Sequence, residues 1–178
     1  ANQHALHHRT TGNLDKRGVG DINTLTVNEF RELGLSDRIV YRIYRNPLFL
    51  FFIAPPIHFL LIQRLPLGDQ MKTKVGWMST MGTNIGISCY YGSLIWAFGL
   101  TPFLWVFTPV VLLSATGAMW LFYVQHQFDD AYWQRSENWN YQDATLLGSS
   151  FYHLPKWMHW VSCNIGYHHI HHLNPTIP

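Results

Sequence analysis

Residues 75–128 have the sequence VGWMSTMGTNIGISCYYGSLIWAFGLTPFLWVFTPVVLLSATGAMWLFYVQHQF, which contains no Asp, Glu, Lys or Arg. A helix needs about 20 apolar residues to cross the hydrocarbon core of a bilayer. Two crossings therefore fit, over approximately residues 76–98 and 103–125, and the GLTP segment at 99–102 supplies the turn between them. The stretch predicts an integral membrane protein with a two-helix transmembrane hairpin.

The composition agrees with a chain of which a large part lies in lipid. Charged residues make up 12% of the 178 residues, about half of the usual share, and aromatic residues make up 16%. The net charge of +2 gives no argument for nucleic-acid binding. Because the chain starts with Ala1 rather than Met, we expect it to be part of a longer protein, truncated at both ends.

Two copies of the pattern His-x-x-His-His, here called the histidine boxes, lie on either side of the apolar stretch. They consist of His4, His7, His8 and of His168, His171, His172. Residues at positions i, i+3 and i+4 share one face of a helix, so each box presents three imidazoles toward one point. Imidazole suits iron, zinc and copper. Because a catalytic zinc ion takes only three protein ligands, two such boxes predict a site for two metal ions.

Other polar residues near the boxes are candidates for the same site. His126 ends the second predicted crossing, which would deliver it to the face of the boxes, although it also fits a polar interfacial role. Asp129, Asp130 and Asn164 are predicted to orient ligands through hydrogen bonds. The two carboxylates equally fit a solvated helix start, and Asn164 also fits a residue that binds a metal-linked water. His169 points about 100° away from its neighbours on a helix, so we do not expect it to be a ligand.

The number of membrane crossings between the two boxes must be even if both boxes build one site. An odd number would separate them by about 30 Å of hydrocarbon. Residues 47–63 form a further apolar run, which contains Pro55-Pro56 and is flanked by basic residues on both sides, as ends that stay in the cytoplasm usually are. We therefore predict that this run is re-entrant or interfacial and that the boxes lie on the cytoplasmic face. The flanking basic residues are Arg42, Arg45, Arg64, Lys72 and Lys74.

The polar segment before this run predicts two short helices. Thr26-x-x-Glu29 is a capping-box pattern that opens the first, and Ser36 is expected to start the second. The second helix separates isoleucine and valine from arginine on its surface. That pattern suits either an anionic membrane surface or an ordinary soluble helix.

Around its histidines, the chain resembles the membrane fatty acid desaturases. The resembling stretches are HALHHRTTGNLD (4–15), WLFYVQHQFDD (120–130) and NIGYHHIHHLNP (164–175), together with RNP (45–47) and GSSFY (148–152). The similarity extends over nearly the whole chain and is closest to the bacterial acyl-lipid Δ12 (omega-6) group. It implies one desaturase domain over residues 1–178. With the apolar runs, it implies an all-α fold in which a helical cytoplasmic cap carries the boxes.

The resemblance also implies a ligand set for two iron ions. His4, His7 and His8 match the second box of the family, His168, His171 and His172 match its third, and His126 matches an extra ligand after the last crossing. The first box of the family, a His-x-x-x-His type motif, has no counterpart in this sequence. We expect it upstream of Ala1, so this fragment alone would lack ligands and be inactive.

The implied reaction uses O2 and two electrons to place a cis double bond between adjacent methylenes of a fatty acyl lipid, with reduction of O2 to water. Ferredoxin or a cytochrome b5-like protein would supply the electrons. Basic residues are candidates for docking such an acidic donor, although they also fit the usual excess of positive charge on the cytoplasmic side of membranes. These residues are Arg9, Lys16, Arg17, Arg135 and Lys156.

Two alternatives to a desaturase stay open at this point. An acyl hydroxylase or a carotenoid-modifying oxygenase would have the same metal site and a different product. A membrane metal-binding or transport protein without enzymatic activity is a more distant alternative, because transport predicts polar ligands inside the crossings.

Overall fold

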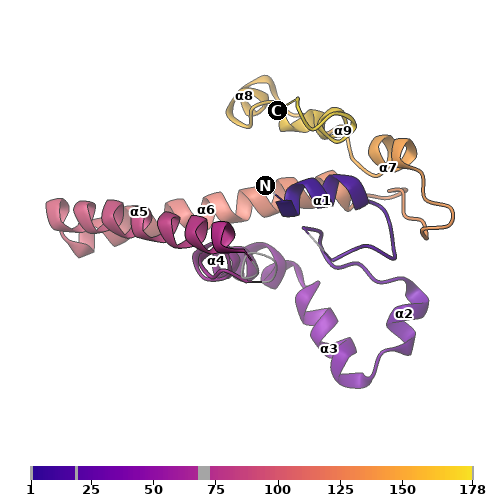
Figure 1. The fold of residues 1–178 in the computed structure, drawn as a ribbon, viewed down its shortest axis with the longest axis horizontal. Helices are drawn as coiled ribbons and strands as arrows, with labels where there is room; N and C mark the ends of the chain where they lie inside the picture. The colour runs from indigo at the N-terminus through magenta and orange to yellow at the C-terminus, as the bar shows by residue number, and fades with distance from the viewer. Residues whose placement is uncertain (1, 19, 68–72, 178) are drawn as a thin grey trace. The chain divides into compact units, whose positions relative to one another are not determined.

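The structure, a computed structural model, describes residues 2–18, 20–67 and 73–177 (Figure 1). The described residues form helices and no strand, apart from one isolated parallel bridge between Asn13 and Gln134. The predicted all-helical fold is therefore confirmed.

The chain forms two compact units, which are described separately. Unit 1 consists of residues 1–33 and 121–178, and unit 2 consists of residues 34–120. The helices of unit 1 are α1 (Asn2–Thr10), α2 (Val27–Glu32), the end of α6 (Leu100–His126), α7 (Tyr141–Leu147), α8 (Lys156–Val161), η4 (Ile165–Tyr167) and α9 (His168–Leu173). Those of unit 2 are α3 (Leu35–Tyr44), η1 (Phe49–Ile53), α4 (Ala54–Leu60), η2 (Ile62–Arg64), α5 (Lys74–Phe98) and the greater part of α6.

In unit 1, the predicted capping box at the start of α2 is confirmed. Thr26 Oγ1 accepts the Glu29 N–H at 3.3 Å, and Glu29 Oε2 accepts the Thr26 N–H at 2.8 Å. Glu29 also accepts hydrogen bonds from Arg17 at 2.6 Å and from Arg135 at 2.9 Å, and Arg135 reaches Asp15 at 2.7 Å. The hydrogen bond from Arg17 holds the pKa of Glu29 well below its usual value. This ion-pair network ties α2 to the segment that follows α6.

The turn after α1 is fixed against the same segment. The Gln134 N–H donates to the Gly12 carbonyl, and the Leu14 N–H donates to the Gln134 carbonyl, both at 2.9 Å. Gly12 has a φ of +69°, and a Cβ added there would lie 2.7 Å from the Tyr132 carbonyl oxygen. Only glycine fits both the backbone angle and the space, so this turn anchors the C-terminal end of α1 in unit 1.

In unit 2, α5 and α6 follow one another with a single-residue turn. Gly99 has a φ of +86°, and α6 begins at Leu100. Pro102 lies in the first turn of α6, where a proline is tolerated because its missing N–H is not needed. The turn is therefore shorter than the predicted 99–102 segment. Near it, the Tyr91 ring lies 5.6 Å from the Phe103 ring and 4.9 Å from the Phe107 ring, so the two helices pack together here.

Among the described residues, α6 is the single helix that is by itself long and apolar enough to cross a membrane. Only 6% of its most apolar 18-residue stretch is buried in the protein, which differs from the core helix of a soluble protein. α5 covers the other predicted crossing but contains several hydroxyl and amide side chains, such as Asn84, which donates to the Arg64 carbonyl at 2.7 Å. The transmembrane hairpin therefore stays a prediction.

The first apolar run forms a broken helix. The π-helical η1 precedes Pro55 and Pro56, which lie at the start of α4, and η2 follows. α3 and the helix over 49–64 together pass the same length and apolarity test but are bent by 61°. Such a bend fits a broken span or a re-entrant segment, so the predicted re-entrant or interfacial placement of 47–63 is not decided.

Two smaller predictions fall beside these elements. α3 starts at Leu35 with Gly34 as its N-cap, one residue earlier than the predicted start at Ser36. Lys72, one of the basic residues predicted to flank the first apolar run, lies outside the described residues.

Candidate metal centre

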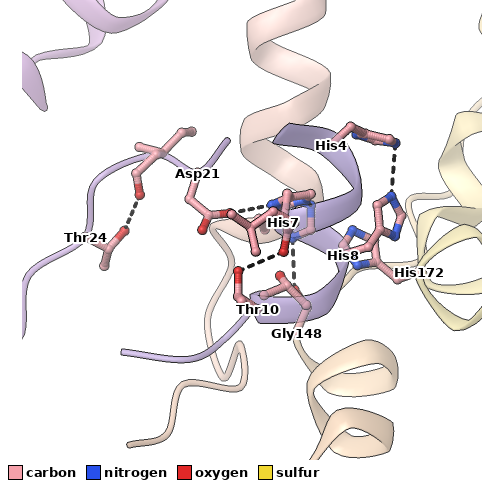
Figure 2. A network of polar contacts seen from close by, with 12 residues as sticks. His4, His7, His8, Thr10, Asp21, Thr24, Gly148 and His172 are labelled. Carbon is pink, nitrogen blue, oxygen red and sulfur yellow. Dashed lines mark hydrogen bonds and ion pairs between the residues drawn. The ribbon is translucent and has the colours of Figure 1, made fainter. Parts of the chain in front are cut away.

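Unit 1 brings together all seven histidines that the sequence predicts as ligands. α1 carries the first box, the last residue of α6 is His126, and α9 carries the second box. Both boxes are helical, as the i, i+3, i+4 spacing predicts. Figure 2 shows the first box projecting from α1 toward the second. Two groups of nitrogens result, and in each the candidate ligand atoms all lie within 4.8 Å of one another.

The first group, called the buried group, consists of His7, His126, His168 and His172. Their exposed fractions range from 0% for His172 to 6% for His126. The Nε2 atoms form a chain of short contacts: His7 to His126 at 3.2 Å, His126 to His168 at 2.9 Å, and His168 to His172 at 3.0 Å. Four side chains from three helices therefore aim the same nitrogen at one enclosed point.

The second group, called the outer group, consists of His4, His8 and His171. His4 Nε2 lies 3.0 Å from His8 Nε2 and 3.2 Å from His171 Nε2. His4 is exposed, His171 is half-buried and His8 is buried. The His8 ring stacks on the His172 ring with centroids 4.1 Å apart, so the two groups are adjacent. The boxes thus divide between two neighbouring sites, each of which contains residues of both boxes.

Hydrogen bonds at the opposite ring nitrogens show that the buried group is suited to a cation. His7 Nδ1 faces the Asp21 carboxylate, and His126 Nδ1 faces the Gly148 carbonyl oxygen. Both of these oxygens accept hydrogen bonds, so each Nδ1 carries the proton and each neutral ring has its lone pair on Nε2. Two lone pairs then face each other across 3.2 Å, an arrangement that a metal ion between them would stabilise.

The spacing of the nitrogens also agrees with a common metal ligand sphere. Imidazole nitrogens bind zinc at about 2.0–2.1 Å. At about 2.1 Å from one ion, nitrogens separated by 2.9–3.2 Å subtend an angle of roughly 90–100° at the metal. Both groups can therefore hold a metal ion without moving their side chains far.

Burial keeps the box histidines in the form that binds metals. Burial, with help from the neighbouring histidines, lowers the pKa of His8 to about 4 and lowers the pKa values of His168 and His172 further. These rings are neutral at pH 7, and neutral imidazole is the metal ligand.

Among the described residues, the predicted supporting side chains make no hydrogen bond to the cluster, whereas an unpredicted one does. Asp129, Asp130 and Asn164 are exposed, and none of their side chains bonds a clustered histidine within the described ranges, so their supporting role stays a prediction. Asp21, which the sequence reasoning missed, faces His7 instead. No spacing rule could have found it, because it lies 14 residues after His7 in a segment without helical periodicity.

His169 belongs to neither group. It lies between His168 and His171 on α9, and its ring lies 6.0 Å from the ring of Phe151 instead. Its exclusion from the ligand set stays a prediction.

An open pocket of about 680 Å³ lies in unit 1, and its lining includes Gln127, which follows His126 in the chain. Its lining is mostly apolar and includes Val124, Leu147 and Phe151. Leu147 and Ser149 flank Gly148, whose carbonyl oxygen bonds His126. The volume falls within the usual range for small-molecule sites.

Comparisons with known proteins show the family of the chain. The family model described as "Fatty acid desaturase" matches residues 1–178. A protein named "Fatty acid desaturase" from Bacillus subtilis (strain 168) is 45% identical over 176 residues, which cover 98% of this chain and 49% of that protein. "Probable fatty acid desaturase DES1" from Sorghum bicolor is 27% identical over 194 residues, which cover 98% of this chain and 46% of that protein.

No solved structure matches the chain. The chain spans about half the length of the curated relatives it matches. The family match covers both histidine boxes and α6, whose last residue is His126. The chain therefore belongs to the fatty acid desaturase family.

Proposed function

We propose that the protein is an O2-dependent di-iron fatty acyl desaturase that introduces a cis double bond at the Δ12 (omega-6) position of a fatty acyl lipid. In the balanced reaction, two adjacent methylenes, O2, two electrons and two protons give one double bond and two water molecules. The observation that carries the proposal is the convergence of the histidines into two adjacent groups. Membership of the desaturase family supplies the substrate class.

The donor set supports two redox-active metal ions. The buried group offers four imidazole nitrogens, and the outer group offers three. Zinc also binds imidazole but has no redox chemistry, whereas removal of hydrogen from an unactivated methylene needs an oxidising metal. Two bound iron ions would supply that chemistry by activating O2. The outer group has fewer ligands, so it leaves room for further ligands from the rest of the full-length protein.

The residues of this chain hold the metal ligands and position the acyl chain. The helices fix the imidazoles, and the Nδ1 hydrogen bonds of His7 and His126 direct their Nε2 lone pairs into the buried group. We assign the acyl chain to the pocket lined by Val124, Leu147 and Phe151, because its lining includes the two neighbours of Gly148, whose carbonyl oxygen bonds His126. The apolar side chains of the lining would contact the methylenes of the acyl chain.

The proposed setting is the cytoplasmic face of a membrane. His126 is the last residue of α6, the helix that is apolar enough to span, so the metal ligands lie at one end of a candidate crossing. An acidic electron donor such as ferredoxin or a cytochrome b5-like protein would dock there. Arg17 and Arg135 are engaged in ion pairs with Glu29, so we assign docking to the exposed Arg9, Lys16 and Lys156.

The test is expression of the full-length protein in a host that lacks desaturase activity, followed by mapping of double bonds in its lipids. We expect a new cis double bond at Δ12. His171→Ala should abolish the product, whereas His169→Ala on the same helix should retain it, because His169 lies outside both groups. A hydroxylated acyl chain or a modified carotenoid as product would contradict desaturation, and an active His171→Ala variant would contradict the ligand assignment.

A further inference from the structure

The cluster contains one carboxylate contact that the proposed reaction does not by itself explain. Asp21 Oδ1 lies 2.5 Å from His7 Nδ1, and the exposed fractions of the two side chains are 9% and 3%. Figure 2 shows Asp21 on the side of His7 that faces away from the second box. Among the described residues, it is the single carboxylate paired with a clustered histidine.

The segment around Asp21 is shaped to hold it in this position. Gly20 precedes it with a φ of +73°, a conformation that glycine adopts without strain. Ile22 follows with an exposed fraction of 4% and anchors the segment in the core of unit 1. Thr24 Oγ1 lies 3.0 Å from the Ile22 carbonyl oxygen and 3.2 Å from Gln127 Oε1, next to His126. A turn, a buried side chain and a polar contact thus place the carboxylate.

We propose that Asp21 is a positioning residue of the metal centre, which fixes the ring and the tautomer of His7 and places a negative charge beside the buried group. This inference rests on the proposed function, since it presumes that the buried group holds a metal ion. It adds a residue outside both histidine boxes to the site.

The orienting part of the role follows from the hydrogen bond. With the proton on Nδ1, the lone pair of His7 is on Nε2, which points toward His126 Nε2 at 3.2 Å. His126 and His171 use backbone carbonyls for the same purpose, those of Gly148 and Ile177. His7 differs because its acceptor is a side chain, so a substitution can remove it.

The charge adds an effect that a carbonyl oxygen cannot supply. The clustered imidazoles bind metal in their neutral form, so they do not offset the positive charge of the ions. A carboxylate bonded to a ligating imidazole raises the basicity of that ligand and thereby strengthens metal binding. It also favours the more oxidised metal, which lowers the reduction potential of the centre. Asp21 therefore contributes to both affinity and potential.

The experiment uses the full-length protein purified with iron and compares Asp21→Asn and Asp21→Leu with the wild type. Asp143→Asn is the matched control, because Asp143 is an exposed aspartate of the same unit outside the cluster. Iron content, iron affinity and the reduction potential are measured, and elution as a single species confirms the fold. Asp21→Leu should weaken iron binding by roughly 10–100-fold. Asp21→Asn keeps an acceptor oxygen without the charge, so it should bind iron better than Asp21→Leu and have a raised reduction potential.

The outcomes separate this inference from the proposed function. If the wild type and both Asp21 variants bind iron equally and have the same reduction potential, Asp21 has no positioning role, although the proposed function stands. If the folded wild type binds no iron, the proposed function fails and the inference fails with it. If Asp21→Leu does not fold, Asp21→Asn decides the question, because an unchanged potential in that variant excludes a contribution of the charge.

Discussion

His126 Nε2 and His168 Nε2 lie 2.9 Å apart, although 42 residues separate them in the chain. The contact joins the end of α6 to the start of α9, and both side chains are buried. His126 Nδ1 bonds the Gly148 carbonyl oxygen, so its Nε2 is available to a metal ion that His168 also binds. This pair links the candidate membrane helix to the second histidine box.

Replacement of His168 should remove the metal of the buried group alone. In the full-length protein, His168→Ala should lower the iron content by about half, because the outer group contains no atom of His168. Metal analysis of the purified protein measures this. His153→Ala is the matched control, since His153 lies outside both groups. If the iron content is unchanged in His168→Ala, or if His153→Ala loses as much iron, the two groups do not act as separate sites.

Metal-free protein should lose stability in acid. The pKa of His8 is lowered from 6.5 to about 4 in the folded state, and those of His168 and His172 are lowered as well. The unfolded chain therefore binds more protons below pH 6.5, so stability is fully present above that value and falls as the pH decreases toward about 4. Thermal unfolding of chelator-treated protein at pH 7.5 and pH 5 measures the loss.

The matched variant for this experiment is His8→Gln, which removes one of the buried imidazoles. Its melting temperature should decrease less between pH 7.5 and pH 5 than that of the wild type, because one group no longer takes up a proton on unfolding. An equal or larger decrease in the variant would show that burial of His8 does not cause the acid sensitivity.

The helical arrangement of the boxes follows from the sequence, because the spacing of their histidines matches the helical repeat. His4, His7 and His8 share one face of α1 as a consequence of i, i+3, i+4 periodicity, and the same holds for α9. His126 follows from its place at the end of an apolar stretch. The division into two groups is not visible in the sequence, because each group combines residues from both boxes.

The positions of the carboxylates near the cluster do not follow from local sequence patterns. Asp129 and Asp130 lie three and four residues after His126, which suggests a shared helical face, but α6 ends at His126 and Asp130 has a φ of +63°. The chain has therefore left the helix before either carboxylate. Asp21 reaches His7 through a turn whose path depends on the packing of Ile22, which no local pattern specifies.

Gly12→Ala should destabilise unit 1 and detach the first box. A side chain there is strained by the φ of +69°, and its Cβ would lie 2.7 Å from the Tyr132 carbonyl oxygen. The expected cost is about 1–3 kcal/mol, with reduced iron content because α1 loses its anchor. Gly18→Ala separates the two effects, since Gly18 also has a positive φ but has open space around it. Equal unfolding temperatures for the two variants would exclude a role for the clash.

Labelling of single cysteines in the full-length protein tests whether the number of membrane crossings between the two boxes is even. The exposed Cys89 and Cys163 are first replaced by serine, and cysteines are then placed at Asn46, Leu67 or Thr101. If the run 47–63 is re-entrant or interfacial, Asn46→Cys and Leu67→Cys should react with a membrane-impermeant reagent from the same side. Thr101→Cys, near the turn between α5 and α6, should react from the other side. The bend of 61° between α3 and the helix over 49–64 also fits a broken span, which would instead place positions 46 and 67 on opposite faces. That result would put an odd number of crossings between the boxes, in conflict with the contacts that join them, so it would overturn either the hairpin or the shared site.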